Sequence, residues 1–399
     1  MQTTLAAAAF FLLLCSYYVL RPVRDDMAVQ TGSDKLQWLF TGTLFFTLLV
    51  VPVFGWVVRR VPPERIVPAV YGFLILNLLG FQAAFAGGVT TAVAATFFIW
   101  LSVFNLFVVS LFWSRMSDIF STEASHRVYG IIAAGGTAGA LTGPALTALL
   151  APRVSTVALL LLATVLLAAA GCCVMLAGRT GRSDGTHRES RPVGGSILAG
   201  VPLTLSLPSL RGITLLIICY TAVSTVLYIE LVDLAGERYT DSGERKAFFA
   251  VIDLAVNALA LTMQMFGTRR IVQRFGLRSA LSIVPLIMLA GLAALGAWRT
   301  AIALGAVQTL HRAGEYAINR PGREMIYTTV DAESRYKAKS FIDTAVYRAS
   351  DAASAWLIAA VRGAGLDAVT IVGIPAALLW LATGIKIGGR HDSHEKIDR

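Results

Sequence analysis

Charged side chains that could bind an anionic solute stand at the end of the first apolar stretch of the chain. Arg21, Arg24 and Asp25 follow the apolar residues 3–20 and are spaced by three and four positions, so they share one face of a helix. Guanidinium groups bind phosphate and carboxylate through two parallel hydrogen bonds. An arginine costs about 2.5 to 3.5 kcal/mol at the centre of a bilayer, so it is rarely kept there without a function. The pattern predicts that these charges face a polar cavity, where Arg21 and Asp25 can pair; the alternative is that they end the helix in water.

Acidic and amide side chains recur in later apolar stretches at helical spacing. Glu230 and Asp233 are three positions apart, and Asp253 and Asn257 share a stripe with Gln264. Glu230 and Asp233 could also mark a helix end, whereas Asp253 has apolar sequence on both sides. We expect these helices, together with two later ones, to line a polar cavity. The later ones contribute Arg312 and Glu315, and then Asp343, Tyr347, Arg348 and Asp351.

The composition places these residues in a membrane protein. Hydrophobic residues make up 56% of the 399 positions and charged residues only 15%, against about 25% charged in ordinary soluble domains. The formal net charge of +10 could indicate a nucleic-acid partner, but most of the 34 Lys and Arg residues lie between the apolar stretches. The sequence has no basic segment interleaved with stacking aromatics, so we expect lipids and a small molecule as partners, and no nucleic acid.

Twelve apolar stretches are long enough to cross a bilayer, since a span needs about twenty residues at a rise of about 1.5 Å each. The sequence therefore predicts an all-α integral membrane protein of about twelve transmembrane helices, in two six-helix bundles related by a pseudo-twofold axis. The expected spans are residues 3–29, 36–58, 66–86, 90–113, 128–150, 154–177, 212–234, 247–268, 279–298, 300–318, 340–361 and 367–386.

The polar segments between the spans predict the domain organisation and the orientation. We expect a bundle over residues 1–177, a basic cytoplasmic linker over 178–210, a second bundle over 211–387 and a cytoplasmic tail over 388–399. Cytoplasmic loops carry an excess of Lys and Arg, and the chain follows this rule when both termini are cytoplasmic. The expected location is a bacterial-type inner membrane.

The two halves resemble each other at two inner loops, as a transporter built from repeats should. The segment "GWVVRRVPPERIVPAV" has a counterpart in "GTRRIVQRFGLRSALS", each with a glycine, an Arg pair and a further basic residue. The segment "SRMSDIFSTEASHRVYG" aligns with "REMIYTTVDAESRYKAK", which places Met116 against Met325. The chain thus resembles the major facilitator architecture, in which two halves rock around a site near the middle of the bilayer.

Glycines stand at four-residue spacing in the fifth expected span, "GIIAAGGTAGALTGP". Gly135, Gly139 and Gly143 form two overlapping small-xxx-small steps, which predict that another helix approaches at backbone distance. The signature of major facilitator antiporters begins at the same spacing, which is met by Gly130, Gly139, Gly143 and Pro144, although Thr147 occupies the place of its next glycine. Close packing explains the same pattern without antiport, so both interpretations remain open.

Three charged segments of the chain carry a narrower family resemblance. They are "LRPVRDDMAV" from residue 20, "ELVDLAGERY" from residue 230 and "REMIYTTVDAESRYKAKSFIDTA" from residue 323. Together with "LFWSRMSDIFSTEASHRVYG", they resemble the corresponding segments of the ATP/ADP translocase-type nucleotide transporters of plastids and intracellular bacteria. The resemblance implies a twelve-span exchanger of nucleotides, typically ATP against ADP with phosphate. It also implies site roles for Arg24, at a basic position usually filled by lysine, for the acid Asp233 and for Lys339.

The chain departs from that family at several charged positions. The glutamate that such transporters carry in the fourth span is replaced by apolar residues near Leu101, and their lysine after the seventh-span acid has no match around Ala235. Glu315 stands where a lysine is expected late in the tenth span. These changes alter the pattern of charges that recognises the nucleotide, so the substrate could be another phosphorylated or anionic metabolite.

The balance of candidate cavity charges leaves the coupling ion open. A polyphosphate site should carry positive charge, whereas a surplus of carboxylates suits proton coupling. Two functions therefore stand side by side: exchange of nucleotides or a related anionic metabolite by alternating access, and proton-coupled antiport of another organic solute. The four candidate cations are Arg21, Arg24, Arg312 and Arg348, and the eight acids are Asp25, Asp26, Glu230, Asp233, Asp253, Glu315, Asp343 and Asp351.

The sequence does not indicate an enzyme. The five histidines show no ligand spacing on a helix face, and the phosphate-cradling pattern GxxxxGK[ST] does not occur. Cys15, Cys172, Cys173 and Cys219 fall in apolar runs, where cysteine behaves as a small hydrophobic residue. We therefore expect no catalysis, no cofactor and no metal site.

Overall fold

The computed structural model describes residues 1–180 and 200–397, and every element in these ranges is helical. Each expected span coincides largely with one long helix, or with a helix that a short helical element continues end to end. The first long helices are α1 (Gln2–Thr31), α2 (Leu36–Arg60), α3 (Pro63–Ala86), α4 (Thr91–Ile119), α5 (Thr122–Leu150) and α6 (Thr156–Thr180). The later ones are α8 (Pro208–Arg238), α9 (Ser242–Phe266), α10 (Thr268–Ala297), α11 (Ala301–Gly314), α14 (Tyr347–Gly363) and α15 (Ile374–Ile397).

Short elements join or interrupt these helices. Within the described ranges, 10 helices are long and apolar enough to cross a membrane, and the two further expected spans are the ones that contain η3 and η4. A π-helical turn leaves the hydropathy pattern unchanged, so sequence reasoning could not find these turns, which often occur at functional sites. The π-helical elements are η3 (Glu315–Asn319), η4 (Ile342–Val346) and η5 (Val369–Gly373); the others are η1 (Ser33–Lys35), α7 (Gly200–Ser206), α12 (Arg320–Tyr327) and α13 (Ala332–Phe341).

The segments expected to link and to end the bundles are only partly described. Residues 181–199 of the expected linker 178–210 lie outside the described residues, and the end of that linker forms α7. The stretch expected as a tail from residue 388 continues α15 as a helix to Ile397. There the Asp392 carboxylate accepts hydrogen bonds from the backbone N–H groups of Leu277 and Arg278 at 2.9 and 3.1 Å, next to Gly276 with its positive φ of 76°.

The described chain forms two compact units that do not follow the expected division into sequence halves. The first part of α9 belongs with the N-terminal helices, because its polar side chains bond to α1. Unit 1 comprises Met1–Ser33, residues 45–180 and Ala235–Asn257, and unit 2 comprises Asp34–Leu44, residues 200–234 and residues 258–397.

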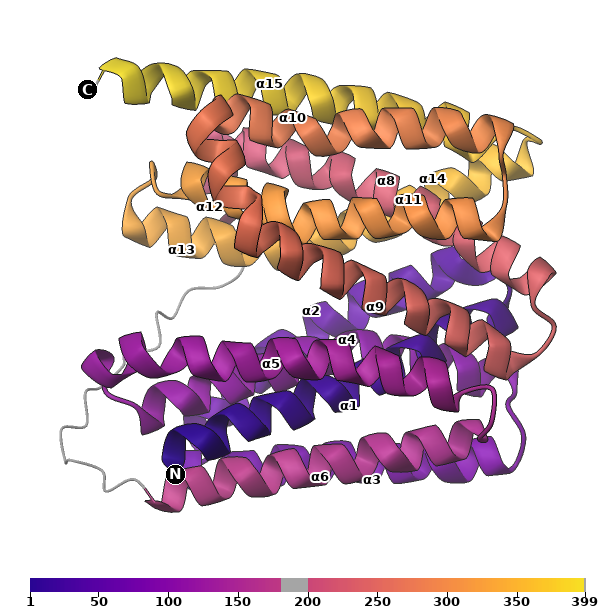
Figure 1. Cartoon of the computed structure of the whole chain (residues 1–399), viewed down its shortest axis with the longest axis vertical. Coiled ribbons are helices and arrows are strands. Elements are labelled where there is room, and N and C mark those ends of the chain that lie inside the picture. Colours follow the sequence, from indigo (N-terminus) through magenta and orange to yellow (C-terminus); the bar gives the residue numbers. More distant parts are fainter. Residues whose placement is uncertain (181–199, 398–399) are drawn as a thin grey trace. The chain divides into compact units, whose positions relative to one another are not determined.

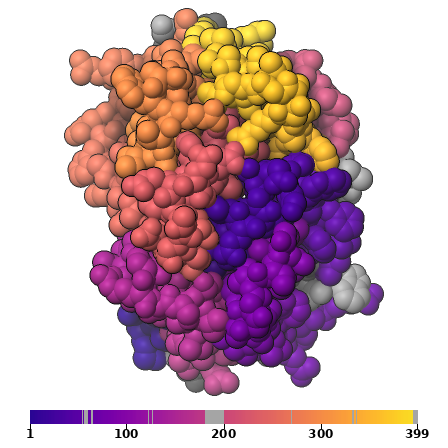
Figure 2. All heavy atoms as spheres, turned by 90° about the vertical axis from the view of Figure 1, so that its right-hand side faces the viewer, coloured from indigo at the N-terminus to yellow at the C-terminus, as the bar shows by residue number. Residues whose placement is uncertain are grey.

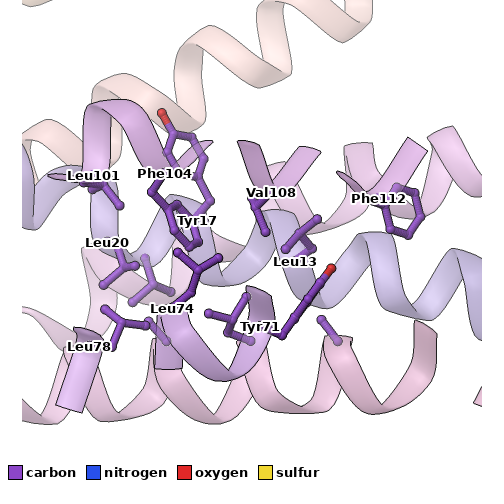
Figure 3. Packing of buried hydrophobic residues seen from close by; sticks show 14 of the residues in the cluster. Leu13, Tyr17, Leu20, Tyr71, Leu74, Leu78, Leu101, Phe104, Val108 and Phe112 are labelled. Carbon is purple, nitrogen blue, oxygen red and sulfur yellow. The ribbon is translucent and has the colours of Figure 1, made fainter. Parts of the chain in front are cut away.

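The helix α1 is the centre of unit 1. It packs against α4, α5 and α6, and Figure 1 shows it running between α5 and α6. Since lipid tails are as apolar as leucine, such packing is held by close van der Waals fit rather than by escape from water. In Figure 3 apolar side chains of α1, α3 and α4 interdigitate, and all of them are buried: Leu13, Tyr17, Leu20, Tyr71, Leu74, Leu78, Leu101, Phe104, Val108 and Phe112.

The glycine stripe of α5 lies directly on the backbone of α1, which confirms the predicted close approach. A Cβ atom on Gly135 would lie 2.5 Å from the carbonyl oxygen of Ala7, and one on Gly143 would lie 2.7 Å from that of Cys15. A Cβ atom on Gly139 would overlap the carbonyl oxygen of Phe11. Contacts that advance by four residues on both helices mean that α1 and α5 run parallel. The stripe therefore fixes the height of the α1 charges within unit 1.

Unit 2 is organised around α10. This helix packs against α15 and α11, and Figure 1 shows α10 and α15 side by side. Two glycines of α15 permit this contact, because a Cβ atom on Gly384 would lie 2.8 Å from the carbonyl oxygen of Leu281 and one on Gly388 would meet the backbone of Arg278. On the other side, η3 and α12 continue α11 and also contact α10. This arrangement holds the charged end of the tenth span against the unit 2 core.

Candidate functional site

Two polar links join α1 to α9 within unit 1. Nε of Arg21 lies 3.5 Å from Oδ1 of Asp253, and the hydroxyl of Tyr18 donates a 3.1 Å hydrogen bond to Oδ1 of Asn257. The Asn257 amide donates in turn to the carbonyl oxygen of Ala140 on α5 at 2.8 Å. The side chain of Arg21 is 14% exposed and that of Asp253 is 1% exposed, so water is largely excluded from this pair. Residues predicted from two separate helices therefore do come together.

Asp26 makes a third link between the same helices. Its Oδ1 accepts a hydrogen bond from Nε of Arg245 at 2.5 Å, and its Oδ2 accepts from the hydroxyl of Ser242 at 2.5 Å and from the amide of Gln30 at 2.9 Å. The Asp26 side chain is fully buried. From the sequence, Asp26 is only one of the eight candidate cavity acids, and Arg245 is not recognised as its partner, because both residues stand near helix ends. The structure shows that this pair holds α9 against α1.

Replacing Asp26 with asparagine is expected to lower the free energy of unfolding by about 3 kcal/mol. The amide cannot neutralise Arg245, which is only 11% exposed, and it leaves that guanidinium buried without its counter-charge. The check is the midpoint of thermal unfolding in detergent, with Glu237→Gln, at an exposed acid near the end of α8, as the matched control. Equal midpoints for the two variants would contradict the structural role given to Asp26.

Arg24 bonds to the residue that follows it. Its Nη2 and Nε donate to Oδ1 of Asp25 at 2.6 and 2.9 Å, and its guanidinium carbon lies 5.1 Å from the ring centroid of Phe98 on α4. Because the two partners are neighbours in the chain, their bond can open without separating two helices. Arg24 can therefore turn its N–H groups to an incoming anion while Phe98 supports its plane. We refer to Tyr18, Arg21, Arg24, Asp25, Asp253 and Asn257 as the α1 cluster.

A second charged network lies within unit 2, where Glu230 and Asp233 of α8 meet two arginines. Arg362 of α14 donates from Nη2 to Glu230 and from Nη1 to Asp233, both at 2.5 Å. Arg299 bonds the other Glu230 oxygen and lies 3.6 Å from Oδ1 of Asp367. Figure 2 shows the α10–α11 connection (orange) adjoining the α14–α15 connection (yellow), as this bridge requires. The predicted cavity acids Glu230 and Asp233 are thus neutralised inside their own unit.

Replacing Arg362 with glutamine is expected to cost about 2 kcal/mol of stability, because Glu230 is 3% exposed at its side chain and keeps only one cation. Arg299→Gln is the matched control: this side chain is 53% exposed, so its loss should cost less than about 1 kcal/mol. Thermal unfolding of both variants in detergent measures the difference. An equal loss in the two variants would show that Arg362 does not anchor Glu230.

The end of the tenth span carries a further cluster in unit 2. Glu315 of η3 accepts a 2.6 Å hydrogen bond at Oε1 from Nη2 of Arg323 on α12. One turn earlier, His311 is fully buried and stacks on Tyr220 of α8 with ring centroids 4.8 Å apart and an angle of 2°. Trp380 of α15 lies edge-on to His311 at 5.8 Å. The cluster thus consists of the Glu315–Arg323 ion pair and, one turn earlier, a histidine packed against two aromatic rings.

Side chains of α9 satisfy backbone groups of η3 in the same unit. The amide of Gln264 donates to the carbonyl oxygen of Tyr316 at 3.0 Å, and the hydroxyl of Thr268 donates to that of Ala317 at 2.6 Å. A π-helical turn leaves carbonyl groups that the regular ladder would occupy, and within a membrane each needs a partner. Gln264, predicted to share a stripe with Asp253, therefore stabilises η3 instead of joining the α1 cluster.

The remaining predicted residues lie around η4 in unit 2, except Arg312, which is buried near the end of α11. Nη1 of Arg348 lies 3.4 Å from Oδ2 of Asp351, and its guanidinium carbon lies 5.5 Å from the ring centroid of Tyr347. Asp343 is exposed. The ammonium group of Lys339 donates to both oxygens of Glu324 at 2.6 Å, which engages the lysine that the family resemblance singles out.

The structure corrects the surplus of acids inferred from the sequence. Each of the eight acids counted there has a basic neighbour, so the clusters are close to electrically balanced. Sequence reasoning overlooked these partners because they stand at helix ends or in connections, where basic residues are expected for topology alone. The overlooked partners are Arg245, Arg299, Arg323 and Arg362. Among the described residues, no three His, Cys, Asp or Glu side chains gather where a metal ion could bind.

Comparison with known proteins decides the family. The model of the Major Facilitator Superfamily matches residues 6–310. The chain belongs to the Major Facilitator Superfamily. None of the curated proteins matches this major facilitator chain in sequence. As a member of that superfamily it is a multi-pass secondary transporter, whereas the narrower resemblance to nucleotide translocases stays a prediction.

Solved structures share the fold of this major facilitator chain at low sequence identity. The nucleoside transporter NupG is 12% identical with a TM-score of 0.67, over 97% of this chain and 96% of its own. The POT family transporter PepTSo is 12% identical with a TM-score of 0.65, over 99% of this chain and 98% of its own. The human organic anion transporter MFSD10 is 14% identical with a TM-score of 0.61, over 96% and 98%. These similarities extend the superfamily fold over nearly the whole chain.

Proposed function

We propose that this transporter exchanges nucleotides, or a related phosphorylated or anionic metabolite, by alternating access. The observation that carries the proposal is the pair of arginines on α1, each shielded from water and each paired with a carboxylate, Arg21 with Asp253 and Arg24 with Asp25. A guanidinium kept in a span needs an anionic partner. An anionic substrate can take the place of that carboxylate.

Of the two arginines, Arg24 is the stronger candidate for direct contact with the substrate. Its partner Asp25 is the next residue of the same helix, so this bond lies within one helix. Arg21 instead ties α1 to α9 through Asp253, and its release would loosen that contact. Substrate binding at Arg24 can therefore be local, whereas binding at Arg21 would be coupled to the packing of α9.

Two further observations support the proposed class of substrate. The segments around Arg24, Asp233 and Lys339 resemble those of nucleotide transporters. Proteins of the same fold are named as transporters of nucleosides, peptides and organic anions. We place both termini in the cytoplasm of a bacterial-type cell, with the basic linker on the same side, because this orientation follows the distribution of Lys and Arg.

A second candidate is proton-coupled antiport of another organic solute. The burial of Asp253, with a loose 3.5 Å contact to Arg21, favours it. A carboxylate in such a place can release its partner when it takes up a proton.

The experiment that tests the proposal is counterflow in liposomes. Purified protein in liposomes loaded with ADP is offered labelled ATP, and empty liposomes serve as the control. Uptake that requires internal ADP supports nucleotide exchange. No nucleotide counterflow at any pH would contradict the proposal and leave proton-coupled antiport as the function to test.

A further inference from the structure

The beginning of α10 and the end of α15 together present five basic side chains. The two helices are in backbone contact there, because a Cβ atom on Gly388 would meet the backbone of Arg278 and one on Gly389 would lie 3.7 Å from its Cδ. Figure 1 shows both segments at the same end of unit 2. We refer to these five exposed residues as the basic surface: Arg270, Arg274, Arg278, Lys386 and Arg390.

The basic surface has no acidic counterpart on its own helices. Neither α10 nor α15 before Asp392 contains an Asp or Glu residue. Asp392 itself is engaged, since its two oxygens accept hydrogen bonds from the backbone N–H groups of Leu277 and Arg278. Arg24 and Arg362 each pair with a carboxylate, whereas the structure shows no ion pair between the basic surface and any described residue. An anion from outside the chain can therefore neutralise this surface.

The exposed apolar face of α15 leads to the same cations. Leu379 is 48% exposed, and Lys386 and Arg390 follow it by seven and eleven residues, which places all three on one side of the helix. At a rise of about 1.5 Å per residue, the two cations lie about 10 and 17 Å beyond the leucine. One leaflet with its headgroups is about 20 Å thick. The face therefore passes from the level of acyl chains to the level of headgroups within the length of one phospholipid.

Large apolar side chains flank the arginines of α10. Met265 and Phe266 at the end of α9 are 65% and 57% exposed. Phe275 is 59% exposed, and its ring centroid lies 5.7 Å from the guanidinium carbon of Arg274. Basic residues beside exposed apolar ones are typical of segments in the membrane interface, where the apolar groups enter the acyl region. A soluble anion would use the charge and not the apolar side chains, whereas an anionic lipid uses both.

We infer that the basic surface binds an anionic phospholipid, whose phosphate contacts Arg278 and Arg390 and whose acyl chains lie along the exposed face of α15. Clusters of Lys and Arg at the end of a membrane span attract anionic lipids, and guanidinium groups bind phosphate through paired hydrogen bonds. The lipid belongs to the leaflet that contains the end of α15. The site shares no residue with the α1 cluster, so the inference holds whichever solute the protein carries.

Native mass spectrometry of the purified full chain in detergent tests the inference. The protein is titrated with phosphatidylglycerol, or with phosphatidylcholine that carries the same acyl chains. Phosphatidylglycerol is expected to bind at least about tenfold more tightly, because each basic residue near an anionic headgroup contributes about a factor of five. Raising ammonium acetate from about 0.05 to about 0.5 M should reduce the difference, since salt screens exposed charges. Equal affinity for the two lipids would overturn the inference.

The double variant Arg278→Gln, Arg390→Gln removes the two proposed phosphate contacts. It should bind phosphatidylglycerol about 25-fold more weakly than the wild type, by a factor of about five for each arginine. Its affinity for phosphatidylcholine should change little, because the acyl contacts remain. Unchanged affinity for phosphatidylglycerol would show that these arginines do not hold the phosphate and would overturn the inference.

The double variant Arg153→Gln, Arg238→Gln is the matched control, with the same loss of charge at two exposed residues. Arg238 ends α8, and Arg153 lies in the α5–α6 connection, which contacts Gly243 at the beginning of α9. Both therefore stand at the opposite end of α9 from Phe266. The control should keep the affinity for phosphatidylglycerol. An equal loss in the two double variants would mean that the lipid responds to net charge alone, which contradicts a site at the basic surface.

Glycerol 3-phosphate distinguishes a lipid from a free phosphate as the occupant. This soluble molecule offers the phosphate without acyl chains, so in molar excess it should not displace bound phosphatidylglycerol, whose apolar chains also contribute to binding. Displacement by glycerol 3-phosphate would overturn the lipid as the occupant. The competition and the comparison of the two lipids use the wild type, so they decide the inference even if the Arg278→Gln, Arg390→Gln variant does not fold.

Discussion

Gly139→Leu is expected to yield no folded, monodisperse protein in detergent extracts. A side chain at this position of α5 would overlap the carbonyl oxygen of Phe11 on α1, and backbone atoms cannot move aside as a flexible side chain can. Overpacking in a core costs about 1 to 3 kcal/mol when side chains can adjust. A clash between the introduced side chain and the α1 backbone at the centre of unit 1 should cost about 3 kcal/mol or more, a large part of a typical folding free energy.

Gly130→Leu is the matched control for this prediction. Gly130 lies on the same helix, but a Cβ atom there would meet nothing within 4 Å. The control should change the thermal midpoint by little, since exposed substitutions usually stay within about 0.5 kcal/mol. Size-exclusion profiles and thermal unfolding of both variants decide the matter. If Gly139→Leu folded as well as Gly130→Leu, the backbone contact between α1 and α5 would be wrong.

Arg24→Ala is expected to raise the KM of exchange by about tenfold to a hundredfold. Hydrogen bonds to charged groups are worth about 1.5 to 3 kcal/mol, and each 1.4 kcal/mol corresponds to about a factor of ten in affinity. The substitution also leaves Asp25, which is 6% exposed, without the 2.6 Å contact that neutralises it. Initial rates of labelled nucleotide uptake at increasing substrate concentration measure the change.

Arg24→Lys is the conservative variant for the same position. The nucleotide transporters that the segment around Arg24 resembles are expected to carry lysine there, so an ammonium group should restore most of the affinity, although it cannot form the paired bonds of a guanidinium. Recovery in Arg24→Lys together with loss in Arg24→Ala would show that the positive charge binds substrate. Unchanged kinetics in Arg24→Ala would show that the charges at the end of the first span have no part in binding.

Much of the fold could be predicted because it depends on signals that are local in the sequence. Apolar length located the spans, and the spacing of Gly135, Gly139 and Gly143 indicated a close helix contact. The identity of the partner could not be inferred, because Ala7 and Phe11 are ordinary apolar residues of α1 and carry no mark of the contact. The π-helical turns were also beyond prediction, since η3 and η4 keep the hydropathy of a regular helix.

The candidate site could be predicted only in part for a related reason. Asp253 is an acid flanked by apolar residues, so its type and place alone mark it, and the structure joins it to Arg21. Arg245, Arg323 and Arg362 stand where a membrane protein carries basic residues anyway. Their role as counter-ions depends on contacts in space, which the spacing of residues along the sequence does not predict. The inferred surplus of acids followed from their omission, and the structure removes it.

The central claim is that cationic side chains of α1 recognise the anionic part of a nucleotide-like solute. Equilibrium binding of labelled ADP to purified protein, in competition with unlabelled ATP or with uncharged adenosine, tests it most directly. Wild type should bind ADP, ATP should displace it, and adenosine at the same concentration should not, while Arg24→Ala should bind ADP weakly. Displacement by adenosine as effective as that by ATP, or no binding of ADP at all, would contradict the claim.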